Sequence, residues 1–141
     1  MDKLRVLIVC TGNSCRSQMA EGWVRHLLGD RVEVASAGTH PGVVVHPLAV
    51  EAMAEVGVDI AGQKPKHVDL FLGEPWDLVI TVCDGAKEEC PYFPGGKEQL
   101  HIGFPDPVLA TGTKEEQLQV YRKVRDDIRA RLVPEIARRC P

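Results

Sequence analysis

The chain alternates short, almost continuous apolar runs with longer segments whose apolar residues recur every three or four positions. The short runs predict buried β-strands over residues 4–9, 32–37, 78–82 and 100–104. The longer segments predict helices over 17–28, 46–56 and 113–136, with a short helical piece over 68–72. Glycines at 29 and 57 are the expected stops of the first two helices.

Two of the predicted helices carry more detailed signals. The 46–56 helix has an apolar stripe made of Leu48, Ala49, Ala52, Met53 and Val56. Thr113 and Glu116 have the spacing of a capping box at the start of the last helix. That helix is expected to end or bend near Pro134, and its buried stripe is Leu118, Tyr121, Val124, Ile128, Leu132 and Ile136.

Strands that alternate with helices predict an α/β fold. We expect a three-layer sandwich in which a four-stranded, mainly parallel sheet is flanked by helices. The 141 residues fit one catalytic domain, 1–141, without internal repeats or a linker. Residues 84–99 are rich in glycine and proline and are expected to form a mobile loop.

Composition narrows the classes of function. Apolar residues make up 44% and charged residues 26%, and the net charge is -3 without a basic block, which argues against a nucleic-acid partner. The first apolar run is too short for a signal peptide or a membrane span, so we expect a cytoplasmic protein, and a monomer. Five cysteines occur without a CxxC pair, which argues against a zinc site and for buried or catalytic thiols.

The segment between the first strand and the first helix reads Cys10-Thr11-Gly12-Asn13-Ser14-Cys15-Arg16-Ser17. Ligands of parallel sheets bind beyond the carboxyl ends of the strands, where Cys10 stands. We expect Gly12 to adopt a conformation that other residues avoid and Asn13 to enter the left-handed region. Inward N–H groups, the helix N-terminus and the forked Arg16 guanidinium then predict a binding loop for a tetrahedral oxyanion.

Cys10 is the predicted nucleophile of this loop. A helix N-terminus and a nearby cation are expected to lower the pKa of its thiol, and Ser17 is placed to donate a hydrogen bond to the sulfur. The alternative is that Cys10 is a buried thiol at a strand end and Arg16 a surface residue. Asp106, between two prolines, is either a turn-forming residue or a general acid that protonates a leaving oxygen; beside an anion loop the second interpretation is favoured.

Cys83 and Cys90 help to distinguish between possible substrates. Cys83 follows an apolar strand as Cys10 does, so both sulfurs are expected at one edge of the sheet. In a straight helix, positions 83 and 90 would lie about 10.5 Å apart. A disulfide needs Cα atoms within roughly 7 Å, so a bridge between them requires the segment to bend. Spare thiols beside a nucleophilic thiol favour reduction, because thiol-bound arsenic(V) accepts two electrons whereas thiol-bound phosphorus(V) is only hydrolysed.

The segment VCTGNSCRSQMAEG, residues 9–22, closely resembles thioredoxin-coupled arsenate reductases built on the low-molecular-weight tyrosine phosphatase fold. The similarity extends to HPLAV (46–50), GVDI (57–60), TVC through CP (81–91) and FPDP (104–107). It covers nearly the whole chain. Gln18 and Val108 stand where phosphatases of this fold usually have proline and an aromatic residue, which favours the reductase.

The resemblance implies a role for each matched residue. Cys10 attacks arsenate, for which phosphate or sulfate are analogues, in the loop of Thr11, Gly12, Asn13, Ser14, Cys15 and Arg16. Asp106 protonates the departing oxygen. Cys83 then attacks Cys10 and releases arsenite, and Cys90 attacks Cys83. The resemblance also implies that the Cys83–Cys90 disulfide is recycled by thioredoxin, without a bound cofactor. Cys15 is matched to a structural thiol, and the resemblance implies no role for Cys140.

Two questions stay open at this level. Some relatives bind potassium through residues matched by Asn13, Glu21 and Ser36, but Lys64-Pro65-Lys66 stands where their aspartate lies. A lysine ammonium is able to replace the ion, so no metal is expected. The rival functions are a tyrosine phosphatase that uses Cys10, Arg16 and Asp106 for hydrolysis, and a non-enzymatic anion sensor; neither needs Cys83 or Cys90.

Overall fold

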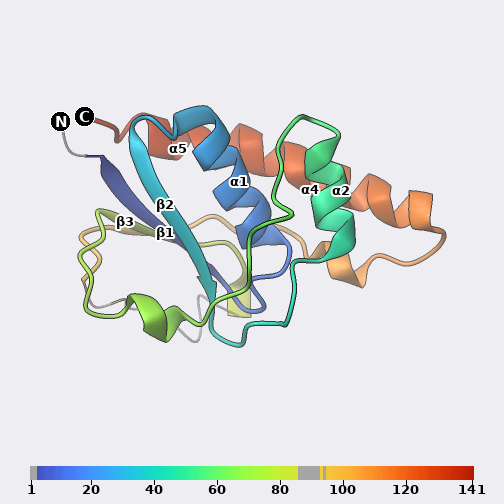
Figure 1. Ribbon diagram of the computed structural model, residues 1–141, viewed down its shortest axis with the longest axis horizontal. Helices are drawn as coiled ribbons and strands as arrows, with labels where there is room; N and C mark the ends of the chain where they lie inside the picture. Colours follow the sequence, from blue (N-terminus) through green and yellow to red (C-terminus); the bar gives the residue numbers. More distant parts are fainter. Residues whose placement is uncertain (1–2, 86–92, 94) are drawn as a thin grey trace.

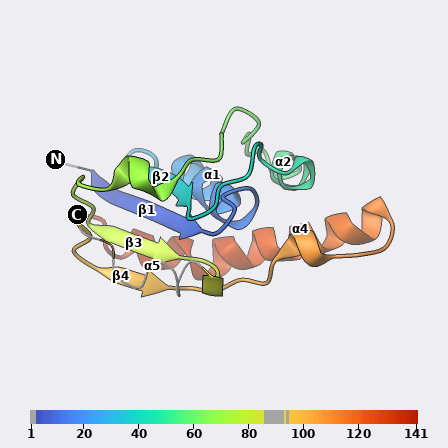
Figure 2. The ribbon, with the colours of Figure 1, turned by 90° about the horizontal axis from the view of Figure 1, so that it is seen from below.

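The computed structural model describes residues 3–85, 93 and 95–141 of the chain. Its centre is a parallel sheet of four strands in the order β2-β1-β3-β4, with all three pairings parallel, as predicted. The strands are β1 (Leu4–Cys10), β2 (Val32–Gly38), β3 (Leu78–Thr81) and β4 (Gln99–His101). Figure 2 shows that all four run in the same direction.

The helices pack against this sheet. They are α1 (Arg16–Leu28), α2 (Pro47–Ala54), α4 (Lys114–Arg131) and α5 (Val133–Ala137), with two 3₁₀ turns, η1 (Val68–Phe71) and η2 (Pro107–Leu109). Figure 1 shows α1, α4 and α5 on one side of the strands and η1 on the other, so the predicted flanked sheet is confirmed. Among the described residues, no helix is long and apolar enough to cross a membrane.

The local signals of the last helix are confirmed. Thr113 and Glu116 form both hydrogen bonds of the capping box. The six predicted stripe residues are all buried. The helix is divided at Leu132, and α5 begins next to Pro134, which lacks the N–H that would continue the α4 ladder.

The second helix is shorter than predicted. It ends at Ala54, and Gly57 adopts a φ of 81° while the Val58 N–H donates to the Met53 carbonyl, as in a Schellman motif. Val56 therefore lies beyond the last helical turn, and 36% of its surface is exposed. At the end of α1, by contrast, Gly29 has φ −60°, so that helix ends without a left-handed residue.

The last two strands are also shorter than predicted. β3 ends at Thr81, although the Val82 N–H still donates to the Val9 carbonyl. β4 ends at His101. Beyond it, Ile102 and Phe104 donate to the Thr81 and Val82 carbonyls as the chain approaches a proline, which has no N–H to continue the ladder. Half of the predicted 84–99 loop, residues 86–92 and 94, lies outside the described residues.

The register of the sheet decides where the site forms. Cys10 pairs with Gly38, and Val9 pairs with Thr81. The carboxyl ends of β1 and β3 therefore lie at the same edge, and the chain continues from there into Cys83. This places two cysteines that are 73 positions apart at one end of the sheet.

Candidate active site

The loop that follows β1 leads directly into α1. Cys15 is the N-cap of α1, it makes no side-chain capping hydrogen bond, and the first turn contains no acidic residue. The positive end of the helix dipole therefore faces the loop without a carboxylate that neutralises it. This is the electrostatic setting that an anion site requires.

The carbonyl groups of the loop are turned outward. The carbonyls of Cys10, Thr11, Gly12 and Ser14 accept backbone N–H groups from the segment 39–46, at 2.9–3.1 Å. Because the two ends of a trans peptide point in opposite directions, carbonyls held outward turn the following N–H groups inward. These N–H groups surround a cavity of about 220 Å³, which is lined by residues 10–16 together with Asp106 and Val108. The predicted nest of donors is present in the loop geometry.

One of the two conformational expectations for the loop is confirmed and one is wrong. Asn13 has φ 49° and is left-handed, whereas Gly12 does not have a positive φ. The glycine that the loop needs is Gly38, at the end of β2: a Cβ there would collide with the Thr11 carbonyl oxygen and lie 3.1 Å from the Asn13 Cβ. The sequence pattern around the loop gives no signal for Gly38, because the close approach comes from a different segment.

The Cys10 sulfur lies at the base of the cavity with 2% of the residue exposed. It accepts the Asn13 N–H at 3.0 Å and lies 2.8 Å from Ser17 Oγ, so the predicted contact with Ser17 is present. Burial raises the pKa of the Cys10 thiol, and the hydrogen bonds from Ser17 and Asn13 lower it only in part. The expected lowering of this pKa is therefore wrong, because removal of the sulfur from water outweighs the donors around it.

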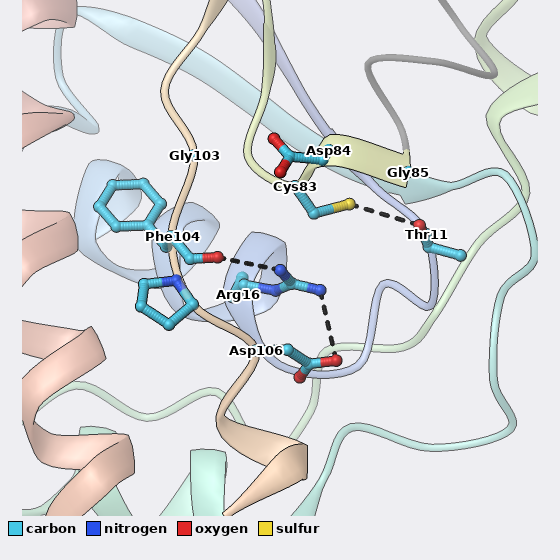
Figure 3. A pocket seen from close by; sticks show the side chains of 9 residues that line it. Thr11, Arg16, Cys83, Asp84, Gly85, Gly103, Phe104 and Asp106 are labelled. Atoms are coloured by element: carbon cyan, nitrogen blue, oxygen red, sulfur yellow. Dashed lines mark hydrogen bonds and ion pairs between the residues drawn. The ribbon is translucent and has the colours of Figure 1, made fainter.

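The position of Arg16 explains in part why the pKa of Cys10 is not lowered. Its guanidinium does not bind the sulfur: Nη1 donates to the Phe104 carbonyl at 3.0 Å, and Nη2 lies 3.6 Å from Asp106 Oδ2. Figure 3 shows the side chain between Phe104 and Asp106. The fork of donors is thus held at the wall of the cavity, where its charge is partly balanced by a carboxylate.

Asp106 combines the two interpretations drawn from the sequence. Its Oδ1 accepts the Val108 N–H at 3.0 Å and caps η2, as a turn-forming aspartate does. Its Oδ2 faces Arg16, and the residue lines the cavity above Cys10. The carboxyl group is therefore placed to reach a ligand of the loop, and its role as a general acid stays a prediction.

A second cavity of about 550 Å³ adjoins the first and shares Thr11, Arg16 and Asp106 with it. Cys83 lines this cavity, is 4% exposed, and points its sulfur at Thr11 Oγ1, 3.3 Å away (Figure 3). The sulfur is also close enough to Cys10 for its charge to raise the pKa of the Cys10 thiol. The structure thus brings Cys10 and Cys83 together, while Cys90 lies outside the described residues.

The other two cysteines lie apart from this pair. Cys15 is buried with its sulfur 3.7 Å from Tyr121 Oη, and burial raises the pKa of its thiol to about 11. The Tyr121 ring is stacked on His46, with 5.3 Å between the ring centroids. Cys140 is partly exposed near the C-terminus, 3.6 Å from the Ile136 carbonyl. The position of Cys15 against α4 fits the predicted structural role.

The three residues matched to a potassium site do gather beneath the loop. Asn13 Nδ2 donates to Ser36 Oγ at 3.0 Å, and Ser36 donates to Glu21 Oε1 at 2.6 Å. Two cations approach the buried Glu21 carboxylate: Arg25 at 2.7 Å and the Lys66 ammonium at 4.0 Å. Within the described part of the chain, no cluster of three or more His, Cys, Asp or Glu side chains is suited to a metal. The Lys66 ammonium lies near the carboxylate that such an ion would approach, and its role in place of the ion stays a prediction.

Comparison with known proteins extends the similarity to the whole chain. Residues 5–137 match the family of low molecular weight phosphotyrosine protein phosphatases. An arsenate reductase of Halalkalibacterium halodurans is 48% identical over 132 residues, 94% of each chain. A solved arsenate reductase in the phosphate binding state superposes with a TM-score of 0.82 at 33% identity, covering 96% of this chain and 98% of that one. A thioredoxin-dependent arsenate reductase of Corynebacterium glutamicum superposes with a TM-score of 0.67 at 31% identity, covering 96% and 62%.

Proposed function

The chain belongs to the low molecular weight phosphotyrosine protein phosphatase family, and on that premise we propose that it reduces arsenate to arsenite. Relatives that match it over almost their whole length are arsenate reductases. A related structure holds phosphate, a tetrahedral anion with the shape and charge of arsenate. The inward N–H groups of the loop and the α1 N-terminus are suited to the same class of anion.

The observation that carries the proposal is the second thiol. Cys83 opens into a cavity that shares Thr11 and Arg16 with the anion site, and its sulfur lies 3.3 Å from Thr11 Oγ1. Hydrolysis of a phosphate ester needs Cys10, a donor for the anion and an acid. Reduction needs in addition a second thiol that attacks the Cys10 sulfur and displaces arsenic, and the position of Cys83 supports that role.

The first step is nucleophilic attack. The Cys10 thiolate attacks arsenic, a sulfur–arsenic bond forms, and an arsenic–oxygen bond breaks. Asp106 supplies the proton with which that oxygen leaves as water. Arg16 and the loop N–H groups balance the negative charge on the remaining oxygens. Because burial raises the pKa of Cys10, we propose that deprotonation of this thiol is coupled to arrival of the anion, which is able to accept the proton.

The second step transfers electrons. The Cys83 thiolate attacks the Cys10 sulfur, a Cys10–Cys83 disulfide forms, and the sulfur–arsenic bond breaks with its electron pair on arsenic. Arsenic(V) becomes arsenic(III), and the two thiols are oxidised to one disulfide. The Cys90 thiolate then attacks Cys83 and expels the Cys10 thiolate. The Cys83–Cys90 disulfide is finally reduced by two thiols of thioredoxin, whose involvement is supported by a thioredoxin-dependent relative.

Hydrolysis of phosphomonoesters is the second candidate function, and the family match favours it as a side activity. It shares attack by Cys10 and protonation by Asp106 with the reductase. Release of inorganic phosphate from p-nitrophenyl phosphate, unchanged in Cys83→Ser, would measure this activity separately. We further propose that the enzyme acts as a monomer in the cytoplasm, where thiols are kept reduced.

The proposal is tested by arsenite release in the presence of thioredoxin, thioredoxin reductase and NADPH. We expect Cys83→Ser and Cys90→Ser to stop multiple turnover, while Cys140→Ser, a matched control far from the cavity, keeps the wild-type rate. Mass spectrometry after a single turnover should find the Cys83–Cys90 disulfide. Equal turnover of Cys83→Ser and the wild type would show that the relay is wrong.

A further inference from the structure

Gln18 has no part in the chemistry proposed above, yet it contacts the anion loop directly. Four of the five carbonyls of residues 10–14 are held by backbone N–H groups of the segment 39–46. The fifth, the carbonyl of Asn13, accepts a side-chain hydrogen bond from Gln18 Nε2 at 3.0 Å. Gln18 lies in the first turn of α1 and is 0% exposed. It therefore completes the set of donors that hold the loop carbonyls outward.

The Asn13–Ser14 peptide is the one whose carbonyl accepts no backbone N–H from the segment 39–46. Asn13 is the non-glycine residue of the loop with a positive φ, 49°, which is a costly conformation for a residue with a Cβ. A rotation of this peptide, which changes ψ of Asn13 and φ of Ser14, would turn the Asn13 carbonyl oxygen into the cavity. A carbonyl there would repel an anion, and the Ser14 N–H would be lost as a donor.

A chain of hydrogen bonds fixes the direction in which the Gln18 amide faces. Arg25 Nη1 donates to Gln63 Oε1 at 3.0 Å. Gln63 Nε2 then donates to Gln18 Oε1 at 2.7 Å and to the Gln18 carbonyl at 3.1 Å. Because a guanidinium only donates, each amide in the chain has one possible orientation. The end of Gln18 that remains for Asn13 is its NH₂ group.

We propose that Gln18 is a positioning residue that holds the Asn13–Ser14 peptide with its carbonyl outward, so that the Ser14 N–H faces the bound oxyanion. Gln63 and Arg25 transmit this orientation from the surface, where half of the Arg25 side chain is exposed. The inference rests on the proposed anion site. It adds to that site a residue which touches neither the substrate nor the Cys10 sulfur.

The test measures binding of inorganic phosphate to the reduced full-length protein by calorimetry. Gln18→Met keeps the length of the side chain but removes the donor, and we expect phosphate to bind roughly tenfold more weakly or worse, the usual effect of losing one hydrogen bond to a charged group. Gln63→Met leaves Gln18 in place without its orienting partner, and we expect a smaller loss of about two- to fivefold. Gln119→Met, on the exposed face of α4, is the matched control and should bind as the wild type does.

A spectroscopic signature separates positioning from a general loss of stability. In the wild type the Ser14 amide proton should move downfield when phosphate is added, as it enters a hydrogen bond with an anion. In Gln18→Met this shift should be absent while the thermal unfolding transition remains cooperative. The KM for arsenate should rise with the phosphate dissociation constant, with a smaller change in kcat.

The outcomes distinguish this inference from the proposed function. A wild type that binds no phosphate would overturn both. A wild type that binds phosphate, with Gln18→Met binding equally well and showing the same Ser14 shift, would overturn the role of Gln18 alone. Should Gln18→Met fail to fold, Gln63→Met decides: weakened binding in that folded variant supports the proposal, and unchanged binding overturns it.

Discussion

We expect the Ser17 hydroxyl to stabilise the thiolate of Cys10. Ser17 Oγ accepts Asn13 Nδ2 at 2.7 Å and lies 2.8 Å from the Cys10 sulfur. Since the Asn13 amide nitrogen only donates, the hydroxyl proton is left for the sulfur. Ser17→Ala therefore removes a donor that stabilises the thiolate, while the donor from the Asn13 N–H remains.

The size of the effect follows from that single contact. A hydrogen bond to a charged group contributes about 1.5–3 kcal/mol, and 1.36 kcal/mol corresponds to a tenfold change in an ionisation equilibrium. Burial already raises the pKa of Cys10, so the thiol is mostly protonated at neutral pH. Ser17→Ala raises this pKa further, and the thiolate fraction at neutral pH should fall by about 10- to 150-fold.

Iodoacetamide alkylation measures this fraction residue by residue. The labelling rate of the Cys10 peptide, followed by mass spectrometry, should rise with pH in the wild type, and the rise should occur at higher pH in Ser17→Ala. Cys15 is an internal control, because its sulfur contacts Tyr121. Ser17→Thr keeps a hydroxyl and should recover most of the rate. Identical profiles for the wild type and Ser17→Ala would refute the assignment of Ser17 as the donor.

Three further outcomes are expected. Asp106→Asn keeps an oxygen for the Val108 N–H but loses the proton donor. The first-turnover burst of arsenate chemistry should therefore slow at least tenfold, and by as much as the ~10²–10⁴-fold typical of general acid catalysis. An unchanged burst would exclude the acid role. Lys66→Met should lower the free energy of unfolding in urea by about 1 kcal/mol, because the Glu21 carboxylate loses a cation. The stability of this variant should depend on potassium, whereas the wild type should be equally stable in potassium chloride and sodium chloride. The pKa of Cys15 is about 11 in the folded protein against 9.0 ordinarily, so the unfolded chain releases this proton first. The free energy of unfolding should therefore fall between pH 9 and 11, by at most about 3 kcal/mol. Cys15→Ala should show a flatter decline over that range, and equal slopes would contradict the burial argument.

Features governed by neighbouring residues could be predicted from the sequence. The apolar run of β1, the left-handed Asn13, the start of α1 and the capping box of Thr113 and Glu116 all depend on contacts within a few positions. The parallel sheet followed from the alternation of strands and helices, and that topology placed Cys10 and Cys83 at one edge. The residue types along a short segment were enough to locate the proposed anion loop.

Features governed by distant segments could not be predicted in this way. The pKa of Cys10 depends on how completely the fold removes its sulfur from water, and no local pattern reports that burial. The close approach to Thr11 falls on Gly38 rather than Gly12 because β2 passes behind the loop. The Arg16 guanidinium is held by a segment some 90 positions away. The sequence determined which groups the site contains, and only the tertiary structure decided which of them face the sulfur, because burial and orientation are set by packing between segments that are far apart in the chain.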